Sequence, residues 1–279
     1  MFVRLSIAAC VLSLIIGSLL GLRERNRPAR LVFLSVGQGD CTAFESQGAT
    51  VLIDVGPKTR EGFDAGDRIV VPRLRAMGFA KVALILLSHP DADHVGGLSA
   101  VMRANPSAQI GISDQFRNHD GMLQTLREAG VDPSKVLWFG RRVSAHLGSF
   151  QLEIVTPAWS GPANDNDGSM FVRLSSGRSS AVFSGDAPIP VETAVAASTH
   201  WTAQLLHAGH HGSRTANGDI WLSQIRPTYA IVSCGRDNTY GHPHRSVLDA
   251  FARHGIAVAR TDTQGDLVME ATEEGFKLR

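Results

Sequence analysis

The feature of this sequence that most constrains its fold is a pattern that occurs twice. Residues Phe44–Asp54 read as a strand, a Gly turn, a second strand and an Asp, and residues Arg173–Asp186 repeat that order. In each half a further apolar segment follows and opens into a loop that carries histidine, at His89 and at His210. Two similar β-rich halves predict two sheets packed face to face with helices outside them.

The chain from residue 31 onward alternates short apolar segments with turns of Gly, Asp and Asn, which is typical of many short strands. We expect strands at Leu31–Val36, Cys41–Glu45, Val51–Asp54, Val82–Leu87, Val136–Phe139, Phe150–Val155, Met170–Leu174, Ser180–Phe183, Gln204–Leu206, Tyr229–Val232, Ile256–Ala259 and Asp266–Glu270. We expect helices at Ile69–Met77, Gly97–Arg103, Gly121–Ala129, Ile189–Ala197, Gly218–Ile225 and Ser246–His254. No linker rich in Pro, Ser or Gly divides this region, so residues 31–279 are predicted to form one domain.

Composition excludes several classes of protein. The 279 residues are 43% hydrophobic and 19% charged, which is too apolar for a disordered chain. Three Cys cannot build a disulfide framework, and no C-x-x-C zinc ribbon is present.

Residues 1–30 differ in character from the rest of the chain. Arg4 precedes an uncharged run, Leu5–Leu22, and basic residues follow it. About 18 uncharged residues suit a signal peptide or a single membrane-spanning helix, and the lack of an A-x-A cleavage site favours an uncleaved anchor. We therefore expect residues 31–279 outside the cytoplasm, secreted, periplasmic or anchored to the cytoplasmic membrane. A lipoprotein signal ending at Cys10 and a buried first helix of the fold remain as alternatives.

The charge of residues 31–279 limits how this part of the chain can bind a polyanion. Residues 1–30 hold five Arg and one Glu of the 27 basic and 26 acidic residues, which leaves 22 basic and 25 acidic residues and a net charge of −3. A body with this charge does not attract polyanions by its overall field, so a phosphate substrate must be held locally.

His and Asp gather on the segment Ser88–Gly97, directly after the apolar run Val82–Leu87. Four candidate metal ligands fall within six residues: His89, Asp91, Asp93 and His94. On an extended loop, alternation would direct the first two side chains to one point and the last two to another. Such a loop can bind two ions, which suits in-line hydrolysis. The alternative is an acidic, solvated loop with incidental histidines.

Two later segments offer further ligands. Asp186 ends an apolar strand and can bridge two ions, although an Asp at this place also suits the N-cap of the following helix. His210 and His211 are adjacent, and on an extended loop they would point in opposite directions, one to a metal and the other to substrate or solvent. His207 lies within a strand and is interpreted as structural.

The segment Asn238–His244 places two imidazoles and a phenol beside a turn. His242 and His244 suit a general acid, and Tyr240 suits anion binding. A surface loop with incidental histidines is the alternative.

Four ordered motifs resemble the metallo-β-lactamase superfamily: His-x-Asp-x-Asp-His-x-Gly-Gly, a later Gly-Asp, His-His-Gly-Ser and Tyr-Gly-His-Pro-His. With Val36–Asp40 they resemble, more narrowly, the extracytoplasmic C-terminal hydrolase domain of the ComEC/Rec2 DNA-uptake proteins. The resemblance covers about residues 31–270. It implies an α+β fold, a four-layer αβ/βα sandwich with a dinuclear metal site at one edge of the two sheets. The ligands that it implies for two divalent ions, Zn²⁺ or Mn²⁺, are His89, Asp91, Asp93, His94, Asp186 and His210.

The sequence departs from the common superfamily pattern at two places. Asp91 stands where most members have His, a substitution shared with the DNA-uptake branch. The middle histidine has no clear counterpart, because His119 and His146 lie in no motif. That branch instead has an Asn-x-x-Ser stretch, matched here by Asn166 and Ser169, which we expect near the metal ligands or at the substrate.

The motifs and the resemblance together predict a metal-dependent phosphodiesterase or nuclease that acts on DNA in a competence-like role. The metal ions would activate water and bear the developing charge. We expect Asp93 to be catalytic, and His242 or His244 to protonate the leaving oxygen. The residues expected to contact substrate are Asn166, Ser169, His211, Ser213 and Tyr240. Since the chain has room for one membrane span at most, we expect it to work alone or with a separately encoded DNA-uptake channel.

Three alternatives remain at this point. The first is another hydrolase of the same fold, acting on esters, thioesters or lactams. The second is a non-catalytic DNA-binding module with a structural metal, which the net charge of −3 disfavours because such modules present a basic face. The third is a redox protein with a di-iron site.

Overall fold

The computed structural model describes residues 28–79, 81–157 and 164–279, which build two sheets. One sheet comprises β1 (Arg30–Phe33), β2 (Thr42–Ser46), β3 (Ala49–Ile53), β4 (Val82–Leu87), β5 (Gln109–Ser113), β6 (Leu137–Phe139), β14 (Leu267–Thr272) and β15 (Gly275–Leu278). The other comprises β7 (Arg142–Leu147), β8 (Phe150–Val155), β9 (Phe171–Ser176), β10 (Ser179–Phe183), β11 (Leu205–His207), β12 (Tyr229–Val232) and β13 (Ala257–Arg260). Their strand orders are β15-β14-β1-β2-β3-β4-β5-β6 and β13-β12-β11-β10-β9-β8-β7.

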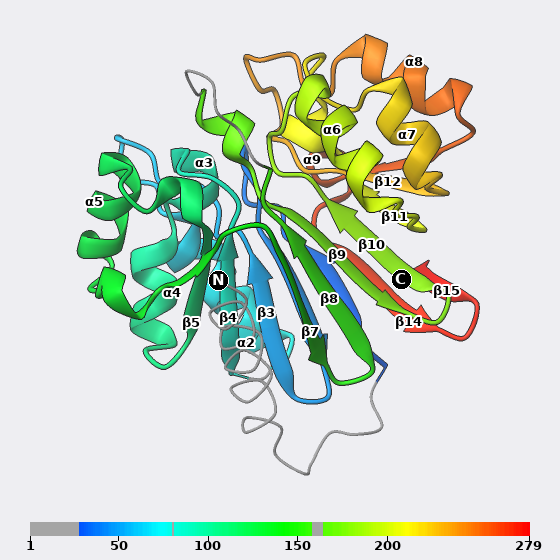
Figure 1. Ribbon diagram of the computed structural model, residues 1–279. Coiled ribbons are helices and arrows are strands. Elements are labelled where there is room, and N and C mark those ends of the chain that lie inside the picture. Colours follow the sequence, from blue (N-terminus) through cyan, green and yellow to red (C-terminus); the bar gives the residue numbers. More distant parts are fainter. Residues whose placement is uncertain (1–27, 80, 158–163) are drawn as a thin grey trace.

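Helices lie on the outer side of each sheet (Figure 1). Those beside the first sheet are η1 (Gly66–Val70), α2 (Val71–Ala76), α3 (Ala92–Val95), α4 (Leu98–Ala104) and α5 (Asp120–Glu128). Those beside the second are α6 (Ile189–Thr199), α7 (Asp219–Ile225) and α8 (Arg245–Arg253), and α9 (Thr261–Gln264) follows β13. Single helical turns are η2 (Asp114–Phe116), η3 (Pro133–Lys135), η4 (Asp165–Gly168) and η5 (Gly209–Gly212).

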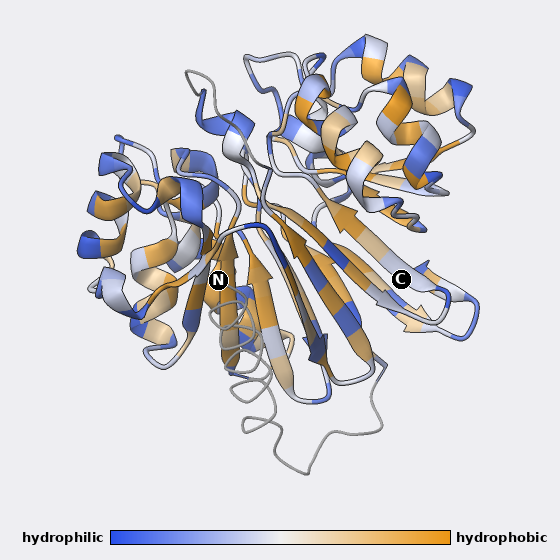
Figure 2. Ribbon diagram, in the orientation of Figure 1, coloured by the Kyte–Doolittle hydropathy of each residue, from blue (hydrophilic) through white to orange (hydrophobic). Residues whose placement is uncertain are grey.

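Three apolar layers hold these elements together. The two sheets face each other across a core that includes Phe33, Phe44, Phe150 and Phe183. A second cluster joins the first sheet to its helices, and a third joins the second sheet to α6, α7 and α8. Figure 2 shows apolar residues concentrated in the strands. Each fully buried Phe or Leu contributes about 1.5–3 kcal/mol relative to an exposed one. The predicted four-layer αβ/βα sandwich is confirmed.

The repeated pattern corresponds to two equivalent units. β2 and β3 form an antiparallel hairpin, and β4 joins it in parallel; β9 and β10 form the second hairpin, and β11 joins it in parallel. Gln47 and Gly48 make the first turn with φ of 51° and 81°, as a two-residue hairpin requires. Because β3 and β4 are parallel to each other, and β10, β11 and β12 are parallel to one another, the loops after these strands gather at one edge.

The sequence analysis does not predict three of the strands, β5, β7 and β15. β5 contains Gly111, a residue that weakens strand propensity, and a Cβ there would lie 2.5 Å from a Phe139 ring atom. β7 alternates exposed and buried positions, and its exposed residues are polar. β15 pairs only with β14 at the sheet edge. The expected helix Ile69–Met77 is present as η1 and α2, and begins earlier, at Gly66.

The predicted signal or anchor, residues 1–22, lies outside the described residues. Within the described ranges, no helix is long and apolar enough to cross a membrane. β1 begins at Arg30, whose guanidinium lies 3.4 Å from the Glu45 carboxylate. The division of the chain into residues 1–30 and 31–279 stays a prediction.

Candidate metal centre

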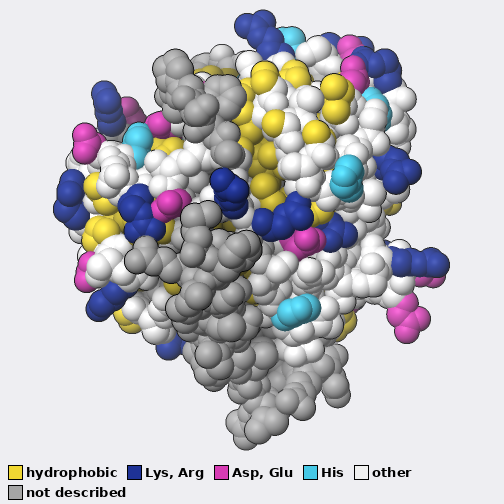
Figure 3. All heavy atoms as spheres, viewed as in Figure 1, with side chains coloured by type: hydrophobic (Ala, Val, Ile, Leu, Met, Phe, Trp, Pro, Cys, Tyr) yellow, Lys and Arg dark blue, Asp and Glu magenta, His cyan; other side chains and the backbone are white. Residues whose placement is uncertain are grey.

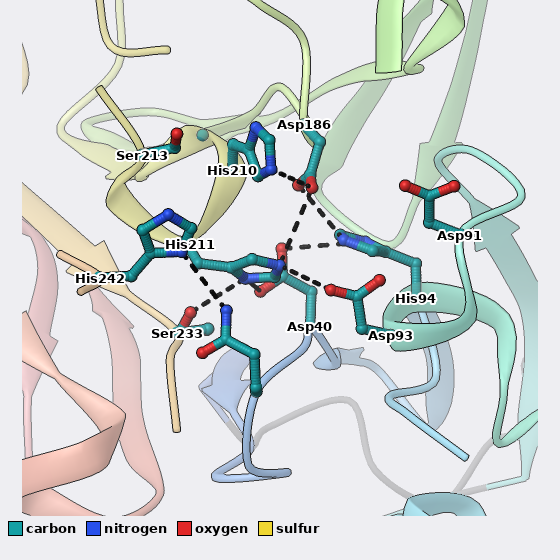
Figure 4. A network of polar contacts seen from close by, with 12 residues as sticks. Asp40, Asp91, Asp93, His94, Asp186, His210, His211, Ser213, Ser233 and His242 are labelled. Atoms are coloured by element: carbon teal, nitrogen blue, oxygen red, sulfur yellow. Dashed lines mark hydrogen bonds and ion pairs between the residues drawn. The ribbon is translucent and has the colours of Figure 1, made fainter. Parts of the chain in front are cut away.

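Most of the predicted metal ligands lie at the sheet edge where the parallel strands end, together with two carboxylates that the sequence analysis did not predict, Asp40 and Asp54. Asp54 follows β3, His89 follows β4, Asp186 follows β10, and the His210-His211 pair follows β11. Asp40 comes from the loop between β1 and β2. Figure 4 shows Asp40, His94, Asp186, His210 and His211 facing one another at this edge.

Four imidazoles surround the Asp186 carboxylate. Their Nε2 atoms lie 3.2 Å (His94), 3.4 Å (His210), 3.8 Å (His89) and 3.8 Å (His211) from its oxygens. The rings of His89 and His94 are 4.2 Å apart at their centroids. All four histidines therefore present the same nitrogen to one carboxylate.

The opposite nitrogen of each ring is fixed by another group. His94 Nδ1 lies 2.8 Å from Asp54 Oδ2, and His211 Nδ1 lies 3.2 Å from Asp40 Oδ1 and 3.1 Å from the Ser233 carbonyl. Since these oxygens only accept, both rings carry a proton on Nδ1. In the neutral form of each ring the Nε2 lone pair then faces the cluster, which is how metal-binding histidines are oriented.

The other two rings, those of His89 and His210, each contact a hydroxyl group. The Ser88 Oγ–H donates to Asp54 Oδ2 at 2.8 Å, so its oxygen accepts from His89 Nδ1 at 2.9 Å. The Thr215 hydroxyl lies 3.2 Å from His210 Nδ1. Asp54 thus orients His94 directly and His89 through Ser88.

The buried polar atoms at the centre fit a cation. His89 Nε2, His94 Nε2 and Asp186 Oδ1 are buried and make no hydrogen bond. In the part of the chain that the structure describes, no Lys or Arg pairs with Asp40, Asp54 or Asp186. Buried carboxylates and orphaned imidazole nitrogens cost free energy unless a cation joins them.

The pKa shifts of Asp186 and His94 also indicate that the cluster needs a cation. Burial raises the pKa of Asp186, but the charges of His94 and His211 outweigh it and hold that pKa well below its ordinary value. Burial lowers the pKa of His94, but Asp186 and Asp54 outweigh it and hold that pKa well above its ordinary value. Without a metal the cluster holds protons on its imidazoles, and a divalent cation can take their place.

Among the residues that the structure describes, two groups of three are close enough to hold an ion, and they share one histidine. His89, His94 and Asp186 form one group, and Asp40, His94 and His211 form the other. In each group the ligand atoms lie within 4.8 Å of one another.

The four ligands of the Ser88–Gly97 segment are grouped differently from the expectation. The chain is extended only to Asp91 and then turns into α3, so His94 returns to face His89. Asp93 Oδ2 lies 3.1 Å from His211 Nε2. Burial raises the pKa of Asp93, but His211 and His94 lower it to about 2. Asp91 stands aside in Figure 4, is 41% exposed and lies 3.5 Å from His89 Nε2.

His210 and His211 do not point in opposite directions, which corrects the expectation. Both adopt the left-handed conformation, with φ of 51° and 54°, instead of an extended one. Both rings therefore turn toward Asp186, where His211 is 2% and His210 is 27% exposed. We predicted His211 as a substrate contact, but the structure brings it into the cluster beside His210.

The Asn-x-x-Ser stretch lies next to Asp186. The Asp186 backbone N–H donates to Ser169 Oγ at 3.2 Å, so Ser169 positions that carboxylate. Asn166 is buried in η4, and its Oδ1 makes no hydrogen bond.

The loop after β12 brings His242 against the cluster. Its ring lies 5.8 Å from His210 and 6.1 Å from His211, and Tyr240 stacks on it at 5.7 Å. Burial lowers the pKa of His242 to about 4, and His211 and His210 add to this effect. His244 instead caps α8, because its Nδ1 accepts from the Ser246 N–H.

Three other histidines and Ser213 stand apart from Asp186. His119 caps α5 and pairs with Asp165, and His146 is exposed on β7, so neither replaces the missing middle histidine. His207 is buried against Phe33 and Phe183, in agreement with a structural role. Ser213 Oγ bonds Thr215 Oγ1, which in turn contacts His210.

The sequence analysis missed Asp40 and Asp54. Asp40 belongs to the Val36–Asp40 motif, which we used only for the resemblance. Asp54 ends the first strand–turn–strand unit at the place where Asp186 ends the second. The position of Asp54 after a strand was its signal, whereas Asp40 lies in the loop between β1 and β2 and only the motif marked it.

A four-layer sandwich with a His/Asp cluster at one sheet edge is the architecture of metallo-β-lactamases, and the chain belongs to the metallo-beta-lactamase superfamily, which matches residues 34–236. Its relatives include proteins named for recombination and for competence. Recombination protein 2 of Haemophilus influenzae is 31% identical over 279 residues, covering 99% of this chain and 33% of that protein. ComE operon protein 3 of Bacillus subtilis is 29% identical over 250 residues, covering 84% and 32%. The chain thus spans about a third of the length of these relatives.

Solved structures share the fold at low identity. The metallo-beta-lactamase fold protein YhfI from Bacillus subtilis has a TM-score of 0.55 and 14% identity over 87% of this chain and 99% of its own. CmlA, a diiron beta-hydroxylase from Streptomyces venezuelae, has a TM-score of 0.58 and 16% identity over 88% and 54%.

Proposed function

We propose that this chain is a metal-dependent phosphodiesterase that cleaves DNA outside the cytoplasm, in a competence-like role. The observation that carries this proposal is the ring of four imidazole Nε2 atoms around Asp186, three of them oriented through Asp40 or Asp54. The names of two relatives, a recombination protein and a competence protein, support DNA as the substrate.

The ligand set supports phosphodiester chemistry. Carboxylates are numerous here, since Asp40, Asp93 and Asp186 lie among the histidines and Asp91 lies 3.5 Å from His89 Nε2. Oxygen ligands favour harder ions such as Mn²⁺, although Zn²⁺ binds most such sites more tightly. We propose two divalent ions, held by His89, Asp91, Asp93, His94, Asp186 and His210. We add His211 to these ligands because its Nε2 lies 3.8 Å from the Asp186 carboxylate.

When bound, the ions would activate water and stabilise the charge that develops on the phosphoryl oxygens. Asp93 is ionised and, at 3.1 Å from His211, can orient the attacking water. The Gln38 side-chain N–H can only donate, so His242 Nδ1 accepts from it at 3.4 Å and the neutral ring carries its proton on Nε2. The neutral His242 ring can thus donate a hydrogen bond from Nε2 to the leaving oxygen, which takes its proton from solvent, whereas His244 is engaged as a helix cap.

Location and partners extend the proposal. We propose that residues 1–22 carry the enzyme to or across the cytoplasmic membrane, and that it acts there on DNA. A separately encoded DNA-uptake channel is the partner that we propose, which the name of one relative, a competence protein, supports.

The decisive experiment measures metal content and substrate class together. The full chain is stripped of metal and reloaded with Mn²⁺ or Zn²⁺, and bis-p-nitrophenyl phosphate, nitrocefin and a thioester are compared. We expect up to two ions per chain by elemental analysis and turnover of the phosphodiester. Turnover of nitrocefin or the thioester alone would refute the phosphodiesterase, and a chain that takes up no metal would refute the metal site.

Matched variants separate the site from the fold. Asp93→Ala and Asp186→Ala should abolish hydrolysis and leave the fold largely intact, apart from the stability that metal binding adds. Asp249→Ala, an exposed carboxylate of α8, is the control and should retain wild-type turnover. Wild-type turnover in either site variant would contradict the assigned roles.

A further inference from the structure

An exposed aromatic side chain extends the metal centre toward solvent. Tyr240 is 68% exposed, yet one face of its ring is stacked on His242, with 5.7 Å between centroids and 23° between planes. His242 in turn lies 6.1 Å from His211 with an angle of 32°. Three rings thus run outward from the cluster, and Tyr240 forms the solvent end.

Hydrogen bonds fix the conformation of the loop that carries Tyr240. Asn238 bonds both ends of the turn, since its Oδ1 accepts from His242 N–H at 2.9 Å and its Nδ2 donates to the carbonyls of Gly235 and His242. The Gln38 side-chain oxygen accepts from Gly235 N–H at 3.1 Å. An aromatic ring on such a fixed loop loses little entropy when it binds a ligand.

The same loop is joined to the segment that carries the paired histidines. His244 N–H donates to the Gly212 carbonyl at 2.9 Å, and a Cβ on Gly212 would lie 2.7 Å from Pro243 Cβ. The position of Tyr240 is therefore fixed relative to His210 and His211, on the side where His242 reaches the cluster.

We propose that Tyr240 is a stacking platform for an unpaired nucleobase next to the phosphodiester at the metal centre, which makes single-stranded DNA the preferred substrate. This inference rests on the proposed function. A neutral aromatic face binds a base by stacking, irrespective of its sequence. Bases in a duplex already stack on each other, so their faces are open only where the strands are separated.

The charge of the molecule favours this mode of binding. With a net charge of −3 outside residues 1–30, the chain lacks the overall positive field by which many proteins hold duplex DNA along its backbone. Affinity must come from contacts at the site itself, namely the metal-held phosphate and a stacked base.

Binding can be tested apart from cleavage. Fluorescence anisotropy measures the Kd of the full, Mn²⁺-loaded chain for a single-stranded phosphorothioate oligonucleotide, which keeps its charge and resists hydrolysis. An abasic strand of equal length and a duplex of the same sequence are the comparison ligands. We expect the base-bearing strand to bind about tenfold more tightly than either, which corresponds to about 1.4 kcal/mol.

Variants identify the residue responsible. Tyr240→Ala should raise the Kd of the base-bearing strand about tenfold and leave that of the abasic strand unchanged, whereas Tyr240→Phe should keep the wild-type Kd because the ring remains. Tyr229, the chain's other tyrosine, is 39% exposed at the opposite end of β12, and Tyr229→Ala is the control.

The outcomes separate this inference from the proposed function. If Tyr240→Ala weakens both strands equally or weakens neither, or if no oligonucleotide binds, the platform is refuted even when bis-p-nitrophenyl phosphate is hydrolysed. If the base-dependent loss is found but no phosphodiester is cleaved, the platform stands and the phosphodiesterase is refuted.

Discussion

At the scale of residues, the structure assigns the carboxylates at this sheet edge to different tasks. Asp186 faces the Nε2 atoms, whereas Asp54 and Asp40 contact the Nδ1 atoms of His94 and His211. A carboxylate at Nδ1 fixes the ring and raises its basicity as a ligand. On the proposed assignment, the same residue type would serve as a metal ligand or as a support for one, depending on which nitrogen it meets.

Asp91 should influence which metal supports turnover. Replacing its carboxylate by an imidazole, Asp91→His, should raise the ratio of Zn²⁺-supported to Mn²⁺-supported activity about tenfold, because nitrogen ligands favour Zn²⁺. The measurement is bis-p-nitrophenyl phosphate hydrolysis by stripped and reloaded protein, with Asp91→Asn as the control. A stripped wild type that is fully active with Zn²⁺ and inert with Mn²⁺ would disprove the carboxylate argument.

Glu192 supports the paired histidines from a distance. It is fully buried in α6, and its carboxylate accepts the backbone N–H groups of Asn217 and Gly218, both at 2.9 Å. The Asn217 side chain bonds the N–H and the carbonyl of Gly209, also at 2.9 Å. Gly209 directly precedes His210, so this chain of bonds holds the left-handed turn in place.

Glu192 should also make stability depend on pH. Burial raises its pKa to about 7, although the N–H groups of Gly218 and Asn217 oppose this shift. Because the folded-state pKa exceeds the ordinary value of 4.5, the contribution of Glu192 is fully present below pH 4.5 and is lost as pH rises through 7.

The size of this effect can be measured against Glu192→Gln, which does not titrate. The free energy of unfolding of the wild type, minus that of the variant, should fall by about 3 kcal/mol between pH 4 and pH 8. Urea unfolding at several pH values gives this difference, and the titration of the metal site cancels from it. A difference independent of pH would show that Glu192 is ionised throughout.

At the scale of elements, glycines let three backbones meet beside the metal centre. A Cβ on Gly97 would lie 2.3 Å from the Val55 carbonyl oxygen and 2.8 Å from Gly66 N. A Cβ on Gly96 would lie 2.2 Å from Lys58 N. The two glycines that close the His/Asp motif thus allow α4 to pack against η1 and the loop after β3.

Gly97→Ala should therefore destabilise the fold by about 3 kcal/mol, because the added methyl group meets backbone atoms that cannot rotate away. Metal affinity should fall as well, since Val55 N–H bonds the His94 carbonyl at 2.8 Å. Gly140→Ala is the control, since a Cβ there meets nothing within 4 Å, and it should change stability by less than about 0.5 kcal/mol. Equal urea midpoints for the two variants would refute the packing argument.

At the scale of the whole molecule, charge is mixed rather than segregated. Figure 3 shows basic and acidic side chains interspersed on the face that it presents. With a net charge of −3 outside residues 1–30, this arrangement fits an enzyme that holds its substrate at one site.

The N-terminal residues should determine where the molecule works. A fusion of residues 1–30 to a reporter that is active only outside the cytoplasm should give activity, because Arg4 precedes the uncharged run Leu5–Leu22. Replacing Leu12 and Leu14 with Arg should abolish that activity by interrupting the apolar run. A full-length chain found soluble in the cytoplasm would contradict the prediction and weaken the DNA-uptake role.

The sequence by itself determined the layers of the fold and most of the residues that meet at the site. Alternating apolar segments and the repeated strand–turn–strand–Asp unit are local patterns, and they predict two sheets because each unit must bury an apolar face. Asp186 and the four histidines of the cluster carried their own signal, since each lies just beyond a predicted strand.

Only the tertiary structure decided how these residues are grouped. The left-handed backbone at His210 and His211 and the turn into α3 reverse the directions that an extended chain would give. Asp40 reaches His211 across 171 positions of sequence, and Gln38 reaches His242 across 204. Such pairs form because loops from both sheets end at one edge, and no local pattern records which loops will face each other there.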